Sequence, residues 1–207
     1  ADICVKQISL GRDGIKGIFS TPTGEVGINS SLIGAFNVSN LLATVAAVSS
    51  LGISPDLIAT GIASSPQIPG RVERVANELD VLALVDYAHT GDALEQVLKT
   101  LSRLNAKKLI TVAGCGGDRD PSKRPVMAAA AVNYSDLAIL TSDNPRTEDP
   151  LEILQQMRQG ALTSGATEYT LADITDRPGK GFVVIPDRRE AIRFAVEQAQ
   201  AGDLLLV

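Results

Sequence analysis

Beyond residue 70 the chain alternates between short apolar runs and helical patterns, and this alternation limits the possible folds more than any other feature. Strands are expected at 71–75, 81–85, 108–113, 137–141, 182–185 and 204–207, and helices at 92–104, 124–133, 150–162 and 188–200. Strands and helices in alternation form a mainly parallel sheet, wound by right-handed crossovers, with helices on both faces. An α/β fold is therefore expected for residues 71–207.

The first 70 residues have a different pattern. Short strand-like segments at 3–9, 15–20 and 25–28, separated by Gly and Pro turns, predict a β-meander. A helix is expected at 37–51, ended by Gly52, and a second begins at Pro55 after Ser54. The segment 67–71 contains Pro69-Gly70 and precedes the change of pattern. We therefore expect two domains, 1–70 and 71–207.

Charge and composition exclude several classes of function. The net charge is −5 with both signs interspersed, and aromatic residues make up 3%, so neither duplex nor single-stranded nucleic acid is an expected partner. Cys4 and Cys115 are far apart and lack metal-ligand spacing, which indicates a reducing compartment and no metal site. The apolar runs are too short to cross a bilayer, and no signal peptide opens the chain. A cytoplasmic protein without a membrane partner is expected.

Three polar loops follow predicted strands: 86–90, 114–120 and 142–147. Open parallel sheets bind ligands at the carboxyl ends of their strands, so the three loops are expected on one rim. Asp86 in the first loop fits a ligand contact and equally fits a cap of the following helix. His89, the only histidine, is a candidate too, although most such histidines have a structural role.

The second loop is rich in glycine but does not match a nucleotide-binding motif. Arg119 occupies the third glycine position of the dinucleotide fingerprint, and Cys115 is expected to be a packed small residue because no base adjoins it. The sequence has no Gly-x-x-x-x-Gly-Lys-Ser/Thr, and 179–181 is expected to be a surface loop. This chain is therefore not expected to hold ATP phosphates in that way.

The third loop, Asp143-Asn144-Pro145-Arg146, places an acceptor, an amide and a guanidinium together around a rigid proline. Such a set suits a zwitterionic amino acid. Arg119 on the adjacent loop adds a second guanidinium, whose planar fork of donors matches a carboxylate. A cluster of surface ion pairs is the alternative.

Five motifs resemble those of the MurE branch of the Mur ligase family, and their order and spacing cover most of the chain. They are Asn37-Val38-Ser39-Asn40, Pro69-Gly70-Arg71, Asp86-Tyr87-Ala88-His89-Thr90, Gly114 to Asp120 with Lys123-Arg124-Pro125, and Asp143-Asn144-Pro145-Arg146. The resemblance implies that 1–70 is the last part of the central ATPase domain. It implies that 71–207 is the Rossmann-like, amino-acid-binding C-terminal domain, with the end of that domain missing.

The resemblance also implies a reaction. ATP, with Mg²⁺, phosphorylates the D-glutamate carboxylate of UDP-MurNAc-L-Ala-D-Glu, and an amine of the incoming amino acid attacks the acyl phosphate. By the same resemblance Asn40 approaches the adenine, Arg71 the ATP phosphates and Asp86 the ribose, with His89 nearby. The loop that ends in Arg146 is the family's mark for meso-diaminopimelate. Arg119 and Arg146 would then hold the carboxylate that lysine lacks.

Departures from the family pattern limit what this chain is expected to do alone. The UDP-sugar domain, the P-loop, the carbamylated lysine that holds magnesium and the C-terminal Gly-Lys-Gly-His-Glu segment are not in the sequence. We therefore expect ATP and Mg²⁺ to be bound mainly by other parts and the isolated chain to be inactive. Gly91 stands where a proline is usual and is expected to loosen the start of its helix.

Two other functions remain open from the sequence. A noncatalytic scaffold, as in plastid relatives that sit in a transcription assembly, would place the chain in the plastid stroma with protein partners. A relative of folylpolyglutamate synthetase would share the C-terminal fold but should lack the Asp143–Arg146 loop.

Overall fold

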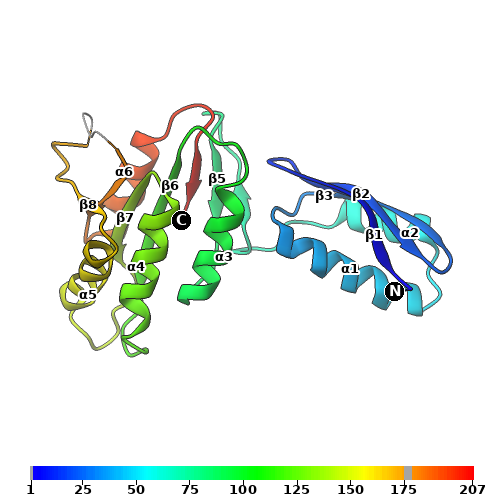
Figure 1. The fold of residues 1–207 in the computed structure, drawn as a ribbon, viewed down its shortest axis with the longest axis horizontal. Coiled ribbons are helices and arrows are strands. Elements are labelled where there is room, and N and C mark those ends of the chain that lie inside the picture. Colours follow the sequence, from blue (N-terminus) through cyan, green and yellow to red (C-terminus); the bar gives the residue numbers. More distant parts are fainter. Residues whose placement is uncertain (1, 175–178) are drawn as a thin grey trace. The chain divides into compact units, whose positions relative to one another are not determined.

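The computed structural model describes residues 2–174 and 179–207 (Figure 1). The chain divides into two compact units, Ala1–Val72 and Glu73–Val207. Each unit is described by itself.

The first unit is a three-stranded antiparallel sheet with two helices. The strands β1 (Cys4–Gly11), β2 (Gly14–Thr21) and β3 (Gly24–Ser30) pair in sequence order, and α1 (Ala35–Ser50) and α2 (Pro55–Ser64) follow. The expected meander and both helices are present. Phe19 of β2, Val45 of α1 and Ile58 of α2 belong to one buried cluster, so the helices cover the apolar face of the sheet. Gly52 has φ 80°, as expected for a residue that ends a helix.

The second unit contains a seven-stranded sheet in the order β4-β5-β10-β6-β7-β9-β8. Its strands are β4 (Glu73–Val75), β5 (Leu82–Val85), β6 (Leu109–Cys115), β7 (Leu137–Ser142), β8 (Thr167–Glu168), β9 (Gly181–Val184) and β10 (Leu204–Leu206). The last strand, β10, lies in the middle of the sheet, parallel to β5 and β6, with Leu204 opposite Leu82 and Leu109. The edge strand β4 is antiparallel to β5, and the other pairings among the described residues are parallel. The predicted wound, mainly parallel α/β sheet is confirmed.

Helices cover both faces of this sheet. The helices are α3 (Gly91–Leu101), α4 (Lys123–Tyr134), α5 (Pro150–Thr163) and α6 (Arg188–Gln198). The first three lie side by side on one face, and α6 lies on the other (Figure 1). On the α6 face, Ala191 and Ala195 pack in one buried cluster with Ile110 and Ile139 of the central strands. The predicted caps are present, because Asp149 accepts from the Leu151 N–H and Asp187 from the Glu190 N–H.

Three element predictions were wrong in detail. The strand expected at 71–75 begins at Glu73, because Val72 has φ 51°, outside the extended region. The helix expected to reach 104 ends at Leu101. The two-residue strand β8 was not predicted, since two residues are too few for a periodic signal. Among the described residues, no helix is both long and apolar enough to span a membrane.

Candidate functional site

A cavity of about 310 Å³ lies at the carboxyl ends of the strands in the second unit. Segments that end or follow β5, β6, β7, β9 and β10 all contribute to its wall. Its charged and amide side chains are Asp86, His89, Arg119, Asp120, Lys123, Arg124, Asp143, Asn144, Arg146 and Arg188. The structure therefore brings the three predicted loops to one site, as the parallel topology requires.

The loops 114–120 and 142–149 are locked to each other through the backbone. The Gly117 N–H donates to the Asn144 carbonyl at 2.9 Å. The Thr147 hydroxyl donates to Asp118 Oδ1 at 2.6 Å. A β-carbon added at Gly117 would lie 1.9 Å from the Pro145 carbonyl oxygen, so only glycine permits this approach. These contacts hold the two loops in fixed positions relative to each other at the rim of the cavity.

Arg146 is anchored to the glycine loop. Its φ is 51°, in the left-handed region that non-glycine residues seldom adopt. Its Nη1 donates to the Gly117 carbonyl, and its backbone N–H donates to Asn144 Oδ1 at 3.3 Å. Arg119 differs, since it is exposed and makes no hydrogen bond or ion pair with the residues that the structure describes. One arginine of the predicted pair is therefore fixed in place, and the other keeps its donors for a ligand.

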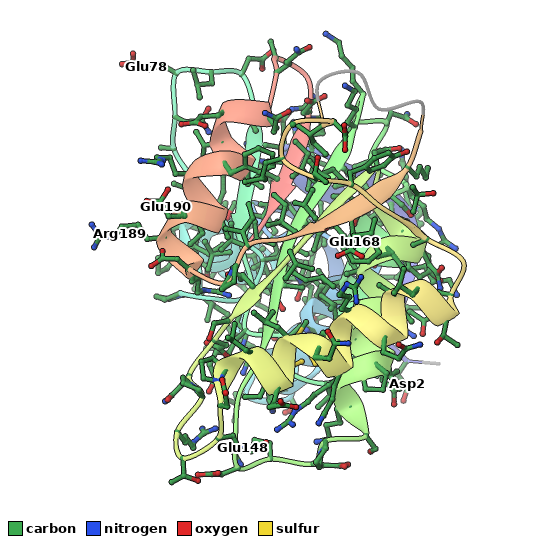
Figure 2. All side chains as sticks on the ribbon, turned by 90° about the vertical axis from the view of Figure 1, so that its left-hand side faces the viewer. Asp2, Glu78, Glu148, Glu168, Arg189 and Glu190 are labelled. Atoms are coloured by element: carbon green, nitrogen blue, oxygen red, sulfur yellow. The ribbon has the colours of Figure 1, made fainter. Side chains whose placement is uncertain are left out.

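Arg124 of the Lys-Arg-Pro motif is a buried arginine that pairs with a carboxylate of this unit. It is 1% exposed. Its Nη2 donates to both carboxylate oxygens of Glu148, and its Nη1 donates to Gln156 at 2.9 Å. Glu148, which lies in the loop before α5 (Figure 2), also accepts the Asp118 N–H at 2.5 Å. The Arg124 guanidinium and this N–H hold the pKa of Glu148 below its usual value.

Asp86 and His89 lie together on the first loop. Asp86 Oδ1 accepts the Ala88 N–H at 2.8 Å, and Thr90, not Asp86, caps α3 through the Ala93 N–H. His89 Nδ1 lies 3.1 Å from the Tyr87 carbonyl, and the two rings are tilted at 5.3 Å. The alternative of Asp86 as a cap of α3 is thus wrong. Asp86 instead stabilises its own turn beside the cavity.

Cys115 lies in the wall of the cavity as a packed side chain. Its Sγ is 3.6 Å from Met127 Sδ. Burial, opposed in part by Arg124 and supported by Asp143, raises the pKa of the thiol to about 11. A thiol of this kind is protonated at neutral pH and is a poor nucleophile. The prediction that Cys115 is a packed small residue agrees with these contacts.

Two predicted site residues, Asn40 and Arg71, belong to the first unit, whereas the cavity belongs to the second. Asn40 Nδ2 donates to Asn37 Oδ1 at 2.9 Å, which fixes its side chain on α1. Pro145 does not line the cavity, and its carbonyl oxygen packs closely against Gly117. The roles assigned to these residues stay predictions.

Lys123 and Arg188 line the cavity but were not predicted there. Lys123 adjoins the glycine loop and was visible as part of the Lys-Arg-Pro motif. Arg188 begins α6 after the short loop that follows β9, and that position was a usable signal, since loops after parallel strands lie on the same rim. Among residues 2–174 and 179–207, no cluster of three or more His, Cys, Asp or Glu side chains could hold a metal ion.

Comparison with known proteins decides the family. The family model "Mur ligase, glutamate ligase domain" matches residues 70–207. The chain belongs to the Mur ligase family. The matched residues include every residue of the cavity wall.

Curated and solved Mur ligases resemble the chain over its whole length. The UDP-N-acetylmuramoyl-L-alanyl-D-glutamate--2,6-diaminopimelate ligase of Geobacter metallireducens is 49% identical over 98% of this chain and 40% of that protein. A solved structure of a ligase of the same name matches with 40% identity and a TM-score of 0.67, covering 100% of this chain and 39% of that one. The chain therefore spans about two fifths of the length of these Mur ligases.

A solved folylpolyglutamate synthase from Thermotoga maritima matches with 17% identity and a TM-score of 0.71, covering 99% of this chain and 43% of that chain. At that identity the likeness shows the fold alone.

Proposed function

We propose that this chain supplies the amino-acid-binding part of a ligase that adds meso-diaminopimelate to UDP-MurNAc-L-Ala-D-Glu in peptidoglycan synthesis. The observation that carries the proposal is the anchoring of Arg146 to Gly117 on a rim that also bears Arg119. The names of the similar ligases support the same substrate.

The proposed selectivity follows from charge. Diaminopimelate carries a second carboxylate where lysine ends in an ammonium alone. Arg119 and Arg146 would hold that carboxylate through charge-assisted hydrogen bonds. Binding lysine would instead leave a guanidinium without a partner, at a cost of roughly 1–3 kcal/mol. A site built to bind a polar group rejects analogues without it by far more than an apolar pocket can.

ATP is the proposed energy source. In the proposed reaction Asn40, Arg71, Asp86 and His89 approach the nucleotide, and the phosphates and Mg²⁺ are held mainly by other parts of the protein. The contribution of this unit is to bind and orient the attacking amine and to keep water away from the acyl phosphate. We propose a cytoplasmic location.

The proposal is tested with the full-length product of the gene that encodes this chain. ADP release is measured with UDP-MurNAc-L-Ala-D-Glu and either meso-diaminopimelate or L-lysine. Activity with diaminopimelate and a strong preference over lysine are expected. Arg119→Gln and Arg146→Gln should each raise the KM for diaminopimelate, whereas Arg103→Gln, an exposed arginine outside the cavity, should not.

A different outcome would point elsewhere. A full-length protein that binds protein partners, releases no ADP and does not rescue a ligase-deficient bacterium would be a scaffold. Equal use of lysine would remove diaminopimelate as the substrate. The 207-residue chain alone is expected to turn over no ATP.

A further inference from the structure

Arg188 is a cavity residue to which the proposed function assigns no role. It is the first residue of α6, half-buried, and it follows directly on the segment after β9. Arg188 follows β9 in the chain, and β7 lies between β9 and β6 in the sheet. Arg188 therefore reaches the cavity from a different side than Arg119.

The guanidinium of Arg188 lies over a glycine, as that of Arg146 does. A β-carbon added at Gly114 would lie 3.3 Å from Arg188 Nη1, and one added at Gly116 would lie 3.0 Å from Arg146 Nη1. Gly114 belongs to β6 and Gly116 follows Cys115, the last residue of that strand, so the two positions are no more than about 7 Å apart. Both guanidinium groups therefore lie along the rim at the end of β6.

The charge of Arg188 is not neutralised by a close partner. Arg188 makes no hydrogen bond or ion pair with any residue in 2–174 or 179–207. The Cβ of Asp143 lies 3.2 Å from the same point above Gly114, but the two side chains form no ion pair. A cation in the first turn of a helix is also disfavoured by the helix dipole. Asp187 at the N-cap and Glu190 in the same turn offset part of this cost without pairing with Arg188, and a bound anion would offset more.

We propose that Arg188 is a specificity-determining residue that adds a third guanidinium, above Gly114, to the Arg119 and Arg146 pair proposed to hold the carboxylate that lysine lacks. This inference rests on the proposed function and extends it. Asp143, beside Arg188, accepts the ammonium group on the same carbon of the ligand. The site thereby recognises an amino-acid end group as a whole, with its anion on guanidinium groups and its cation on one carboxylate.

The test compares Arg188→Gln with Arg189→Gln in the full-length protein. Arg189 lies in the same helical turn, and its substitution by Gln removes the same charge. Its side chain projects outward from α6 and does not line the cavity (Figure 2). Steady-state kinetics with meso-diaminopimelate, the UDP-linked dipeptide and ATP are measured for both, with calorimetric binding of diaminopimelate alone and thermal unfolding as further readouts.

Arg188→Gln is expected to raise the KM and Kd for diaminopimelate about tenfold to a hundredfold, the loss of a charged hydrogen bond. The KM for ATP and the melting temperature should stay close to wild type. The preference for diaminopimelate over lysine should shrink by a similar factor. Arg188→Lys keeps the charge but loses the planar guanidinium, so its KM for diaminopimelate should lie between those of wild type and Arg188→Gln. Arg189→Gln should match wild type.

The inference is overturned if Arg188→Gln and Arg189→Gln have the same KM, or if Arg188→Gln lowers only the melting temperature and kcat. These results leave the proposed function intact as long as the wild-type protein uses diaminopimelate. A wild-type protein that neither uses nor binds diaminopimelate would overturn both proposals together.

Discussion

Arg124 Nη2 lies 2.7 and 2.8 Å from the two carboxylate oxygens of Glu148. This ion pair joins α4 to the loop that carries Arg146. Because Glu148 also accepts the Asp118 N–H, one carboxylate holds both rim loops. The pair is asymmetric, since the Arg124 side chain is 2% exposed and that of Glu148 is 32% exposed. Removal of Glu148 leaves a buried cation, whereas removal of Arg124 leaves a carboxylate that water can reach.

This asymmetry predicts that Glu148→Gln destabilises the second unit more than Arg124→Met. The Glu148 contribution should also depend on pH. A carboxyl whose native pKa is lowered stabilises the fold above its unfolded pKa of about 4.3, and that stability is lost as pH falls through the lower native value. The difference in urea midpoint between wild type and Glu148→Gln should be constant near neutral pH and shrink below about pH 4.

Glu78→Gln is the control for that series. Glu78 projects into solvent (Figure 2) and has no hydrogen bond or ion pair within the part of the chain that the structure describes. Its substitution should leave the midpoint unchanged at every pH. A Glu148→Gln midpoint that tracks this control would show that the buried arginine does not depend on its partner.

Gly117→Ala should separate the two rim loops. The new β-carbon would overlap the Pro145 carbonyl oxygen at 1.9 Å, and neither backbone can yield without breaking the Gly117–Asn144 hydrogen bond. A fall in kcat/KM for diaminopimelate of about a hundredfold is expected, consistent with a loss of a few kcal/mol of positioning.

Gly116→Ala is the comparison for this variant, because its β-carbon would meet only the end of the Arg146 side chain at 3.0 Å and the Asn144 carbonyl at 3.4 Å. Its effect on the melting temperature of the second unit should be much smaller than that of Gly117→Ala, because no backbone has to move. Equal losses in the two variants would contradict the view that the loops are held by close backbone approach.

Gly160 and Gly61 predict opposite effects of the same substitution. A β-carbon at Gly160 of α5 would lie 2.3 Å from Pro125 Cα, so alanine must push α4 and α5 apart, at a cost of about 3 kcal/mol. Gly61 lies in α2 with open space around it, and alanine there should stabilise the first unit by about 1 kcal/mol. Thermal unfolding of both variants measures this. Stabilisation by Gly160→Ala would refute the close packing of the helices.

The two cysteines should differ sharply toward a thiol reagent. Cys4 is exposed, and Cys115 is buried with a pKa of about 11. At pH 8 one thiol per chain should react quickly and the other only after denaturation. Cys4→Ser should remove the fast reaction. Rapid labelling of Cys115 in that variant would mean that its burial is incomplete.

Local patterns predicted most of the fold. The run Leu137–Thr141 and the capping residues Asp149 and Asp187 mark their elements clearly, because alternation and caps depend on nearby residues alone. The order of the strands was not accessible in this way. Nothing in Leu204–Leu206 itself states that it pairs with both β5 and β6.

The candidate site was predictable where residues sit on loops after strands. Arg119, Asp143 and Arg146 line the cavity for that reason. Arg124 was harder, because its position looks helical and its contacts with Glu148 and Gln156 cross 24 and 32 residues of sequence. The nucleotide contacts assigned to Asn40 and Arg71 follow from the family resemblance and stay predictions.

The position of β10 also affects how the protein forms during synthesis. Leu82 pairs with Leu204, so the first central strand leaves the ribosome about 120 residues before its neighbour exists. At bacterial or eukaryotic elongation rates that interval is on the order of ten seconds. From the synthesis of β6 until that of β10, the facing edges of β5 and β6 have no strand between them. The nascent chain is then most exposed to wrong pairing, and a chaperone that shields those edges would raise the yield of folded protein.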